Sequence, residues 1–234
     1  MNTAIIVAAG SGQRFAADRR KQFVQLAGKP LIFHTLEKFE SCPVIDEIIL
    51  VLSEEGRHQF EAISPKSEIS KLRSIIAGGL SRFESVRNGL DAIDALKADV
   101  VVTHDGARPL VTVDEITRTV EKAAVTGAAC LVADVTDTIK EIGGGYISRT
   151  IDRNKLRRAL TPQAFSYNLL RRAFDAGDLH DSITDECYLV EKLGVKIAYV
   201  EGSSRNIKIT RPDDLIFAEA VLGADSERFG IADN

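Results

Sequence analysis

The sequence predicts an α/β fold in which helices flank a mostly parallel, Rossmann-like sheet. Apolar runs of strand length at residues 4–8 and 47–52 are each followed by a segment of helical periodicity, beginning at Pro30 and at Glu55. This alternation is typical of the βαβ units that build a parallel sheet. The first strand also runs directly into a glycine turn at residues 10–12, and such a turn at the end of a buried strand is a common anion site.

Two further helices are predicted by their N-terminal sequences. Ser81 with Glu84, and Thr112 with Glu115, match the capping box, in which each side chain accepts a hydrogen bond from the backbone N–H of the other residue. After the first box, apolar residues recur at helical spacing: Val86, Leu90, Ile93 and Leu96. We therefore expect the first of these helices to bury one face that includes all four residues.

Between the two capping boxes, residues 99–104 form a nearly continuous apolar run. Such a run predicts a strand that is buried on both faces, in the centre of the sheet. The run ends in polar residues, with Asp105 and Arg108 in the segment 105–109. Since ligands of open α/β sheets bind at the carboxyl ends of the strands, we expect this loop and the glycine turn to face one crevice.

Residues 137–152 depart from the alternation and predict a hairpin arm. Two strand-like runs, 138–142 and 146–151, flank three consecutive glycines. A two-stranded arm cannot bury both of its faces by itself. We therefore expect the arm to pack on a second copy of the chain, in a homodimer.

The remaining segments complete a single domain that spans residues 1–234. We expect helices over 166–176 and 184–193, a strand over 195–200, a last helix from Pro212 and a polar tail over 225–234. No linker rich in Pro, Ser or Gly divides the chain.

The composition excludes several classes of protein. A net charge of −4 gives no broad basic surface for nucleic acid. The three cysteines are too few and too widely spaced for a disulfide framework or a zinc site. The apolar runs are strand-sized and no signal sequence opens the chain, so neither secretion nor membrane insertion is expected. These features predict a cytoplasmic enzyme.

The glycine turn does not match the common dinucleotide or Walker motifs. Phe15 stands where dinucleotide-binding turns place a third glycine, and no Gly-Lys-Ser/Thr triplet follows. Arg14 and Lys21 instead flank a loop of small residues whose N–H groups can surround one phosphate. Two alternatives stay open at this point: the glycines serve only a positive φ, or each cation is simply solvated.

Other polar residues lie near the ends of predicted elements. Lys208 lies in the apolar run 206–210, and because burying an unpaired ammonium is costly, its side chain is expected to reach an anion. The alternative is an edge-strand lysine that extends to water. Arg153 directly follows the hairpin arm. We interpret His104 as a hydrogen-bonded histidine at a strand end and assign it no chemistry.

No arrangement for a covalent nucleophile stands out in the sequence. The pattern favours displacement at phosphorus, in which positioning and charge neutralisation supply the catalysis. Cations from separate segments would stabilise the transition state, and Asp105 is a candidate to help hold a divalent metal ion near the phosphates.

Taken together, these motifs resemble one known family over residues 5–222. The chain is similar to the 2-C-methyl-D-erythritol 4-phosphate cytidylyltransferases of the non-mevalonate isoprenoid pathway. The resemblance lies in these segments: 8–14, Lys21-Gln22, Gly78-Gly79 with Arg82 and Ser85, 104–109, Asp137-Thr138, Asp152-Arg153, 160–163, 184–186 and 206–210.

The resemblance implies that CTP and methylerythritol phosphate react, with Mg²⁺, and that pyrophosphate is released. It implies catalytic roles for Arg14 and Lys21 at the triphosphate, and for Arg153 and Lys208 at the attacking phosphate. The nucleotide would contact Ala8, Ala9, Gly10, Ser11, Gly12, Gly79 and Ser85. The methylerythritol side would be lined by Asp105, Arg108, Thr138, Thr161 and Thr184. The family is commonly dimeric, with each hairpin arm reaching over the partner's site.

The sequence departs from the family pattern at two positions, and two rival functions stay open. Leu80 stands where many relatives have an acid, and Arg20 where proline is frequent. One rival is a ribitol phosphate cytidylyltransferase, which differs where the polyol phosphate binds; residues 151–154 and 160–163 favour methylerythritol phosphate. The other is a non-catalytic nucleotide-binding module on the same fold, against which the intact set of cations argues.

Overall fold

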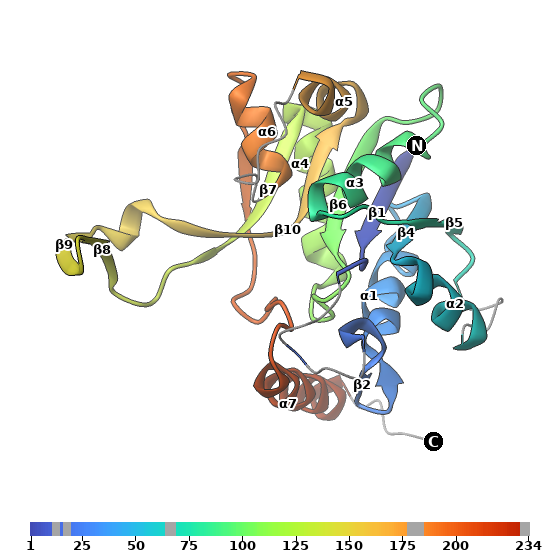
Figure 1. Cartoon of the computed structure of the whole chain (residues 1–234), viewed down its shortest axis with the longest axis horizontal. Helices are drawn as coiled ribbons and strands as arrows, with labels where there is room; N and C mark the ends of the chain where they lie inside the picture. The colour runs from blue at the N-terminus through green and yellow to red at the C-terminus, as the bar shows by residue number, and fades with distance from the viewer. Residues whose placement is uncertain (11–14, 16–19, 64–68, 177–184, 230–234) are drawn as a thin grey trace.

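The computed structural model describes residues 1–10, 15, 20–63, 69–176 and 185–229. A seven-stranded sheet runs through the molecule in the order β11-β7-β10-β6-β1-β4-β5 (Figure 1). Its strands are β1 (Asn2–Val7), β4 (Glu47–Leu52), β5 (Leu72–Ala77), β6 (Val100–Asp105), β7 (Ala128–Asp134), β10 (Arg157–Ser166) and β11 (Ala198–Glu201). Every pairing is parallel except those of β10, which runs antiparallel to β6 and β7. The predicted α/β class with a mostly parallel sheet is confirmed, and β6 is its fully buried central strand.

Helices cover both faces of this sheet because the strand residues alternate between two apolar clusters. Ile6 and its even-numbered neighbours in β1 pack with one set of helices, and Ile5 and Val7 pack with the other. The first set is α1 (Leu31–Glu40), α2 (Glu54–Ile63) and α4 (Val113–Thr126). The second set is α3 (Arg82–Asp91), α5 (Tyr167–Ala176) and α6 (Glu186–Lys192). The result is a three-layer molecule.

The last helix, α7 (Pro212–Phe229), packs outside these layers. Its apolar residues share a cluster with Leu26, Ala107 and Ile209. Leu26 belongs to a short hairpin of β2 (Gln25–Leu26) and β3 (Lys29–Pro30), which follows the 3₁₀ turn η1 (Lys21–Phe23). Helix α7 thus packs against the residues that flank Lys21, among them Leu26, and against Ile207 and Ile209, which flank Lys208.

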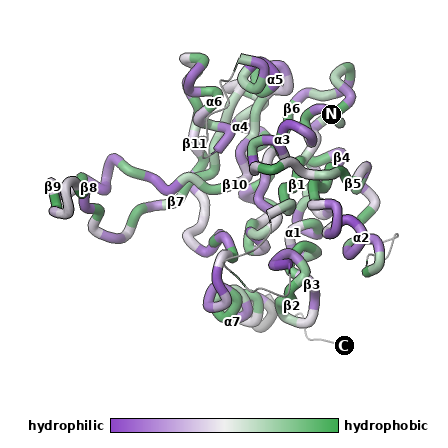
Figure 2. The backbone as a smooth tube through the Cα atoms, viewed as in Figure 1, coloured by the Kyte–Doolittle hydropathy of each residue, from purple (hydrophilic) through white to green (hydrophobic). Residues whose placement is uncertain are grey.

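The hairpin arm is present as predicted. Strands β8 (Ile139–Gly143) and β9 (Tyr146–Ile151) pair with each other and lie away from the body of the molecule (Figure 1). A second 3₁₀ turn, η2 (Arg153–Lys155), follows at the base of the arm. Apolar side chains on the arm are largely exposed, with Ile142 at 77% and Tyr146 at 80%, so apolar segments lie outside the core (Figure 2).

Helix α3 is shorter than predicted. It ends at Asp91, and Leu96 is almost fully exposed rather than part of the buried face. The Asp94 carboxylate accepts a hydrogen bond from the Leu96 N–H, which closes a turn instead of continuing the helix. At the other end, Ser81 caps the helix as predicted, but the Glu84 carboxylate accepts from the Leu80 N–H in place of the Ser81 N–H.

Other boundaries also differ from the prediction. The capping box of Thr112 and Glu115 is complete, but β11 begins only at Ala198, and α6 begins at Glu186 with Asp185 as its N-cap. The run 206–210 is not part of a strand. Helix α7 continues through the first residues of the expected polar tail. No helix in the part of the chain that the structure describes has the length and apolar character needed to cross a bilayer.

Gly78 allows the end of β5 to approach the end of β1 closely. A Cβ at Gly78 would lie 2.3 Å from the Ala9 Cβ and 2.8 Å from the Ser85 Oγ. We predict that Gly78→Ala lowers the free energy of unfolding by about 1–3 kcal/mol, because the buried walls must move apart. Gly10→Ala, where no atom lies within 4 Å, is the matched control and should change it by less than about 0.5 kcal/mol in urea titrations. Equal effects of the two variants would contradict the close-approach argument.

Candidate active site

A pocket of about 730 Å³ lies at the carboxyl ends of β1, β4, β5 and β6, where the sequence predicted one crevice. It brings together eight of the predicted site residues: Ala8, Ala9, Gly10, Lys21, Gly79, Ser85, Asp105 and Lys208. Leu80 lies at this pocket with its side chain fully exposed, and Arg20 lies there in an ion pair with Glu55. Ser11, Gly12, Arg14 and Thr184 are outside the described residues.

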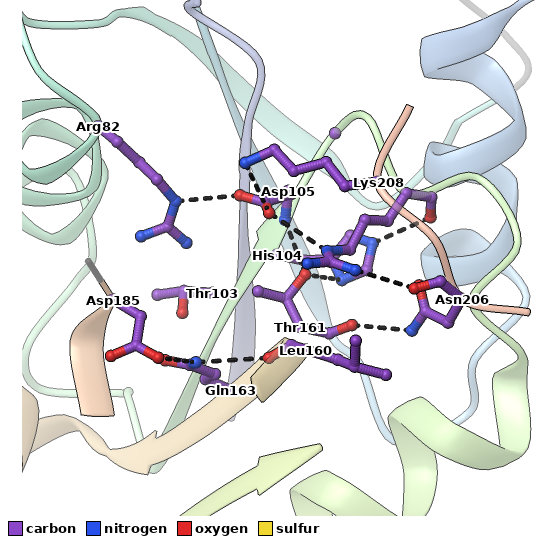
Figure 3. Close-up of polar contacts among 12 residues, drawn as sticks. Arg82, Thr103, His104, Asp105, Leu160, Thr161, Gln163, Asp185, Asn206 and Lys208 are labelled. Carbon is purple, nitrogen blue, oxygen red and sulfur yellow. Dashed lines mark hydrogen bonds and ion pairs between the residues drawn. The ribbon is translucent and has the colours of Figure 1, made fainter. Parts of the chain in front are cut away.

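Asp105 is the centre of the charged groups at this pocket. Its Oδ1 lies 3.0 Å from the Arg82 Nε, and its Oδ2 lies 3.0 Å from the Lys208 Nζ and 3.3 Å from the Arg108 Nε (Figure 3). Burial alone would raise the pKa of Asp105, but the three cations outweigh burial and hold that pKa well below its usual range. The carboxylate is therefore ionised throughout the physiological range. Lys208 forms an ion pair with Asp105, as the sequence predicted for its side chain.

Arg82 also binds a second carboxylate. Its two terminal nitrogens donate to the two oxygens of Glu186, the Nη2 to the Oε2 at 3.1 Å, and Glu186 is only 1% exposed. The Thr103 hydroxyl donates to the same Oε2 at 2.7 Å. Burial alone would lower the pKa of Arg82, but Glu186 and Asp105 raise it, so the guanidinium stays charged. The buried Glu186 carboxylate is therefore paired with a cation and hydrogen-bonded, as a buried charge must be to be stable.

Thr161 joins the end of β6 to the segment that carries Lys208. Strand β10 shifts its register between Ala159 and Gln163, and at this irregularity the Thr161 hydroxyl accepts a hydrogen bond from the Asp105 N–H at 3.1 Å. Its backbone carbonyl accepts from the Asn206 side-chain amide at 3.0 Å (Figure 3). Arg108 donates to the Asn206 carbonyl at 2.8 Å. These contacts hold Asn206 in place and so fix the backbone position from which the Lys208 side chain extends.

His104 is a buried, hydrogen-bonded histidine, as interpreted from the sequence. Its Nδ1 lies 3.0 Å from the Thr161 hydroxyl and its Nε2 lies 3.3 Å from the Arg108 carbonyl (Figure 3). Because the Arg108 carbonyl can only accept, the ring proton is on Nε2, and the Thr161 hydroxyl donates to the unprotonated Nδ1. Complete burial lowers the pKa of His104 to about 3, so the ring is neutral.

Arg153 and Thr138 do not line this pocket. The Arg153 guanidinium donates to the Thr136 carbonyl at the base of the arm, where it lines a second pocket of about 320 Å³ with Asp134, Asn154 and Arg157. Thr138 directly precedes strand β8 of the arm. Within one chain, the predicted site therefore divides into a sheet half and an arm half.

Comparison with known proteins identifies the family. A model of the family 2-C-methyl-D-erythritol 4-phosphate cytidylyltransferase (IspD) matches residues 2–224. The chain belongs to this family. A curated relative of that name from Bacillus velezensis is 44% identical over 224 residues, which cover 95% of this chain and 96% of the relative. A relative of the same name from Halalkalibacterium halodurans is 42% identical over 225 residues, covering 96% of this chain and 97% of the relative.

Solved IspD structures have the same fold as this chain. The crystal structure of 4-diphosphocytidyl-2C-methyl-D-erythritol synthase from Anaerococcus prevotii is similar with a TM-score of 0.83 and 31% identity, covering 95% of this chain and 96% of that chain. The IspD of Francisella tularensis gives a TM-score of 0.78 and 34% identity, with coverage of 94% and 98%. The family resemblance noted in the sequence is confirmed.

Sequence reasoning gave no role to two charged residues of the site, Arg82 and Glu186. A signal was present for Arg82, since a cation in the first turn of a helix is disfavoured by the helix dipole and implies a carboxylate nearby. Glu186 was marked only by its place in segment 184–186 of the family resemblance, because an acid in the first turn of α6 is by itself an ordinary surface residue.

The neutral state of His104 predicts acid sensitivity. The unfolded chain takes up a proton at His104 near pH 6.5 and the folded chain only near pH 3, so stability decreases as the pH falls below 6.5. We expect about 1.4 kcal/mol per pH unit from this residue between pH 6 and 4.5. His34, whose pKa burial also lowers, adds in the same direction. Urea titrations of the wild type and His104→Gln isolate the effect: the variant should show a shallower slope, and equal slopes would contradict a neutral His104.

Proposed function

We propose that this chain transfers a cytidylyl group from CTP to 2-C-methyl-D-erythritol 4-phosphate, giving 4-diphosphocytidyl-2-C-methyl-D-erythritol and pyrophosphate. The observation that carries the proposal is the pocket that Lys21 and Lys208 line together with the backbone of residues 8–10 and Gly79, in a chain of the IspD family. Such a pocket offers both cations and the backbone of a strand end, which suits a nucleoside triphosphate.

In the proposed reaction the methylerythritol phosphate attacks the α-phosphorus of CTP and pyrophosphate leaves. Negative charge on the phosphoryl oxygens is highest in the five-coordinate transition state, so fixed cations there lower the barrier. We assign this role to Arg14, Lys21 and Lys208. The nucleotide would contact Ala8, Ala9, Gly10, Ser11, Gly12, Gly79 and Ser85.

We assign the methylerythritol side to Asp105, Arg108, Thr138, Thr161 and Thr184, with Arg153 at the attacking phosphate. The Asp105 carboxylate remains ionised, so it is an acceptor for polyol hydroxyls rather than a proton donor. Thr161 and Arg108 contact Asp105 directly and fix its position.

We propose that Mg²⁺ enters with CTP. Among the described residues no cluster of three or more carboxylate, histidine or cysteine ligands is present, so the protein has no metal cage there. Mg²⁺ commonly binds through one or two carboxylates and the substrate phosphates. Three of the roughly four acceptor positions of Asp105 are used by cations, so this carboxylate has one position left for Mg²⁺ and would be a single ligand beside the substrate phosphates. The ion would neutralise phosphate charge.

We propose that the active form is a homodimer in which the arm of each copy completes the partner's site. The separation of the arm half, with Arg153, from the sheet half, with Lys208, supports this arrangement. The exposed apolar residues of the arm, including Ile142 and Ile147, give it a surface to bury on a second copy.

The reaction is tested by CTP-dependent release of pyrophosphate with methylerythritol phosphate and Mg²⁺. We expect turnover with methylerythritol phosphate, much slower turnover with ribitol phosphate, and a loss of about 100-fold or more in kcat for Lys21→Ala with the fold intact. Preference for ribitol phosphate would replace the proposed substrate. CTP binding without any pyrophosphate release would indicate the non-catalytic module.

The trans arrangement is tested by mixing two inactive variants, Lys208→Ala in the sheet half and Arg153→Ala in the arm half. In a hybrid dimer one of the two sites combines an intact pocket with an intact arm. Random assembly should therefore restore about one quarter of wild-type activity after co-expression. If the mixture is as inactive as each variant alone, or if sedimentation shows a monomer at micromolar concentration, the arm does not act across a dimer.

A further inference from the structure

We infer that Arg82 and Glu186 are positioning residues, which hold the Asp105 carboxylate in place while Lys208 acts on the phosphate. The inference rests on the proposed function but adds two residues that carry no role in it. It begins from the position of Lys208, whose Nζ lies 3.0 Å from the Asp105 Oδ2 and whose side chain is 37% exposed at the pocket. To neutralise a phosphate, the ammonium must leave Asp105 or share its charge with it.

Asp105 is held by a ring of contacts that does not include Lys208. Thr103 and Asp105 point to the same face of β6, because side chains alternate along a strand. The Thr103 hydroxyl donates to Glu186, and Glu186 binds the two terminal nitrogens of Arg82. The Arg82 Nε donates to the Asp105 Oδ1 (Figure 3). The ring begins and ends on one strand, so it fixes Asp105 whether or not Lys208 is present.

The charges of the cluster balance without Lys208. Arg82 and Arg108 supply two positive charges, and Asp105 and Glu186 supply two negative charges. Lys208 is the surplus cation. Its charge is therefore available to the phosphates, and when it moves away the two arginines and the two carboxylates remain paired with each other. Without Glu186, one of the two arginines would be surplus as well and would compete with Lys208 for the phosphates.

A purely structural ion pair would contact the same atoms, so the test must separate folding from positioning. Replacing both partners of a buried pair with apolar residues of similar size leaves no unpaired charge and commonly preserves stability. The variant is therefore Arg82→Met combined with Glu186→Met. We expect it to remain folded, with kcat lowered at least about tenfold and the KM for CTP changed by less than about threefold.

A matched control is available elsewhere in the chain. Arg171 also lies between two carboxylates, those of Asp91 and Asp175, but away from the pocket. Arg171→Met combined with Asp91→Met should leave both kcat and KM unchanged. A second test variant, Glu186→Gln, keeps the volume and the Thr103 hydrogen bond, and should show the same kinetic split without depending on the fold of the double variant. Arg82→Lys, which reaches only one carboxylate, should retain more of the wild-type kcat than the single variant Arg82→Met.

The outcomes separate this inference from the proposed function. If the wild type releases no pyrophosphate from CTP, the proposed function fails. If the wild type is active and Glu186→Gln keeps the wild-type kcat, or raises KM without lowering kcat, the positioning role is overturned.

Discussion

The buried carboxylate of Asp105, surrounded by Arg82, Arg108 and Lys208, is the interaction on which the site depends. An ionised carboxylate at the end of a buried strand is tolerable only with such partners, and each partner comes from a different part of the chain. Arg82 begins α3, Arg108 follows β6 and Lys208 precedes α7. Satisfying one charge therefore brings together segments up to about half the chain apart.

The sheet explains why those segments meet at one place. The ends of β1, β4, β5 and β6 lie side by side because these strands are parallel, so the turns that follow them share one pocket. The antiparallel strand β10 adds Thr161 to the same place through its register shift, and it also leads the chain back from the arm. Strand β10 therefore contacts Asp105 of the pocket wall through Thr161, while the arm that precedes it lies away from the body of the molecule. The dimer proposed above, in which each arm completes the partner's site, requires this separation.

Local patterns predicted those parts of the molecule that depend on neighbours in sequence. The strand 47–52, the capping box at Thr112 and the glycine hairpin were confirmed because their apolar period or turn chemistry lies within a few residues. The predicted end of α3 was wrong because the Asp94 carboxylate accepts a hydrogen bond from the Leu96 N–H, which a longer helix would have used within its backbone. The position of β10 and the burial of Glu186 depend on long-range pairing, and no short window of sequence contains that information.

A structure of the protein with CTP and Mg²⁺ bound tests the roles of Asp105 and Lys208 most directly. We expect the triphosphate in the pocket at the ends of β1 and β6, with the Lys208 Nζ within hydrogen-bonding distance of a phosphate oxygen. We also expect Arg82 to bridge Asp105 and Glu186 in that state. A triphosphate bound elsewhere, or a Lys208 that stays on Asp105 while Arg82 moves to the phosphates, would contradict these roles.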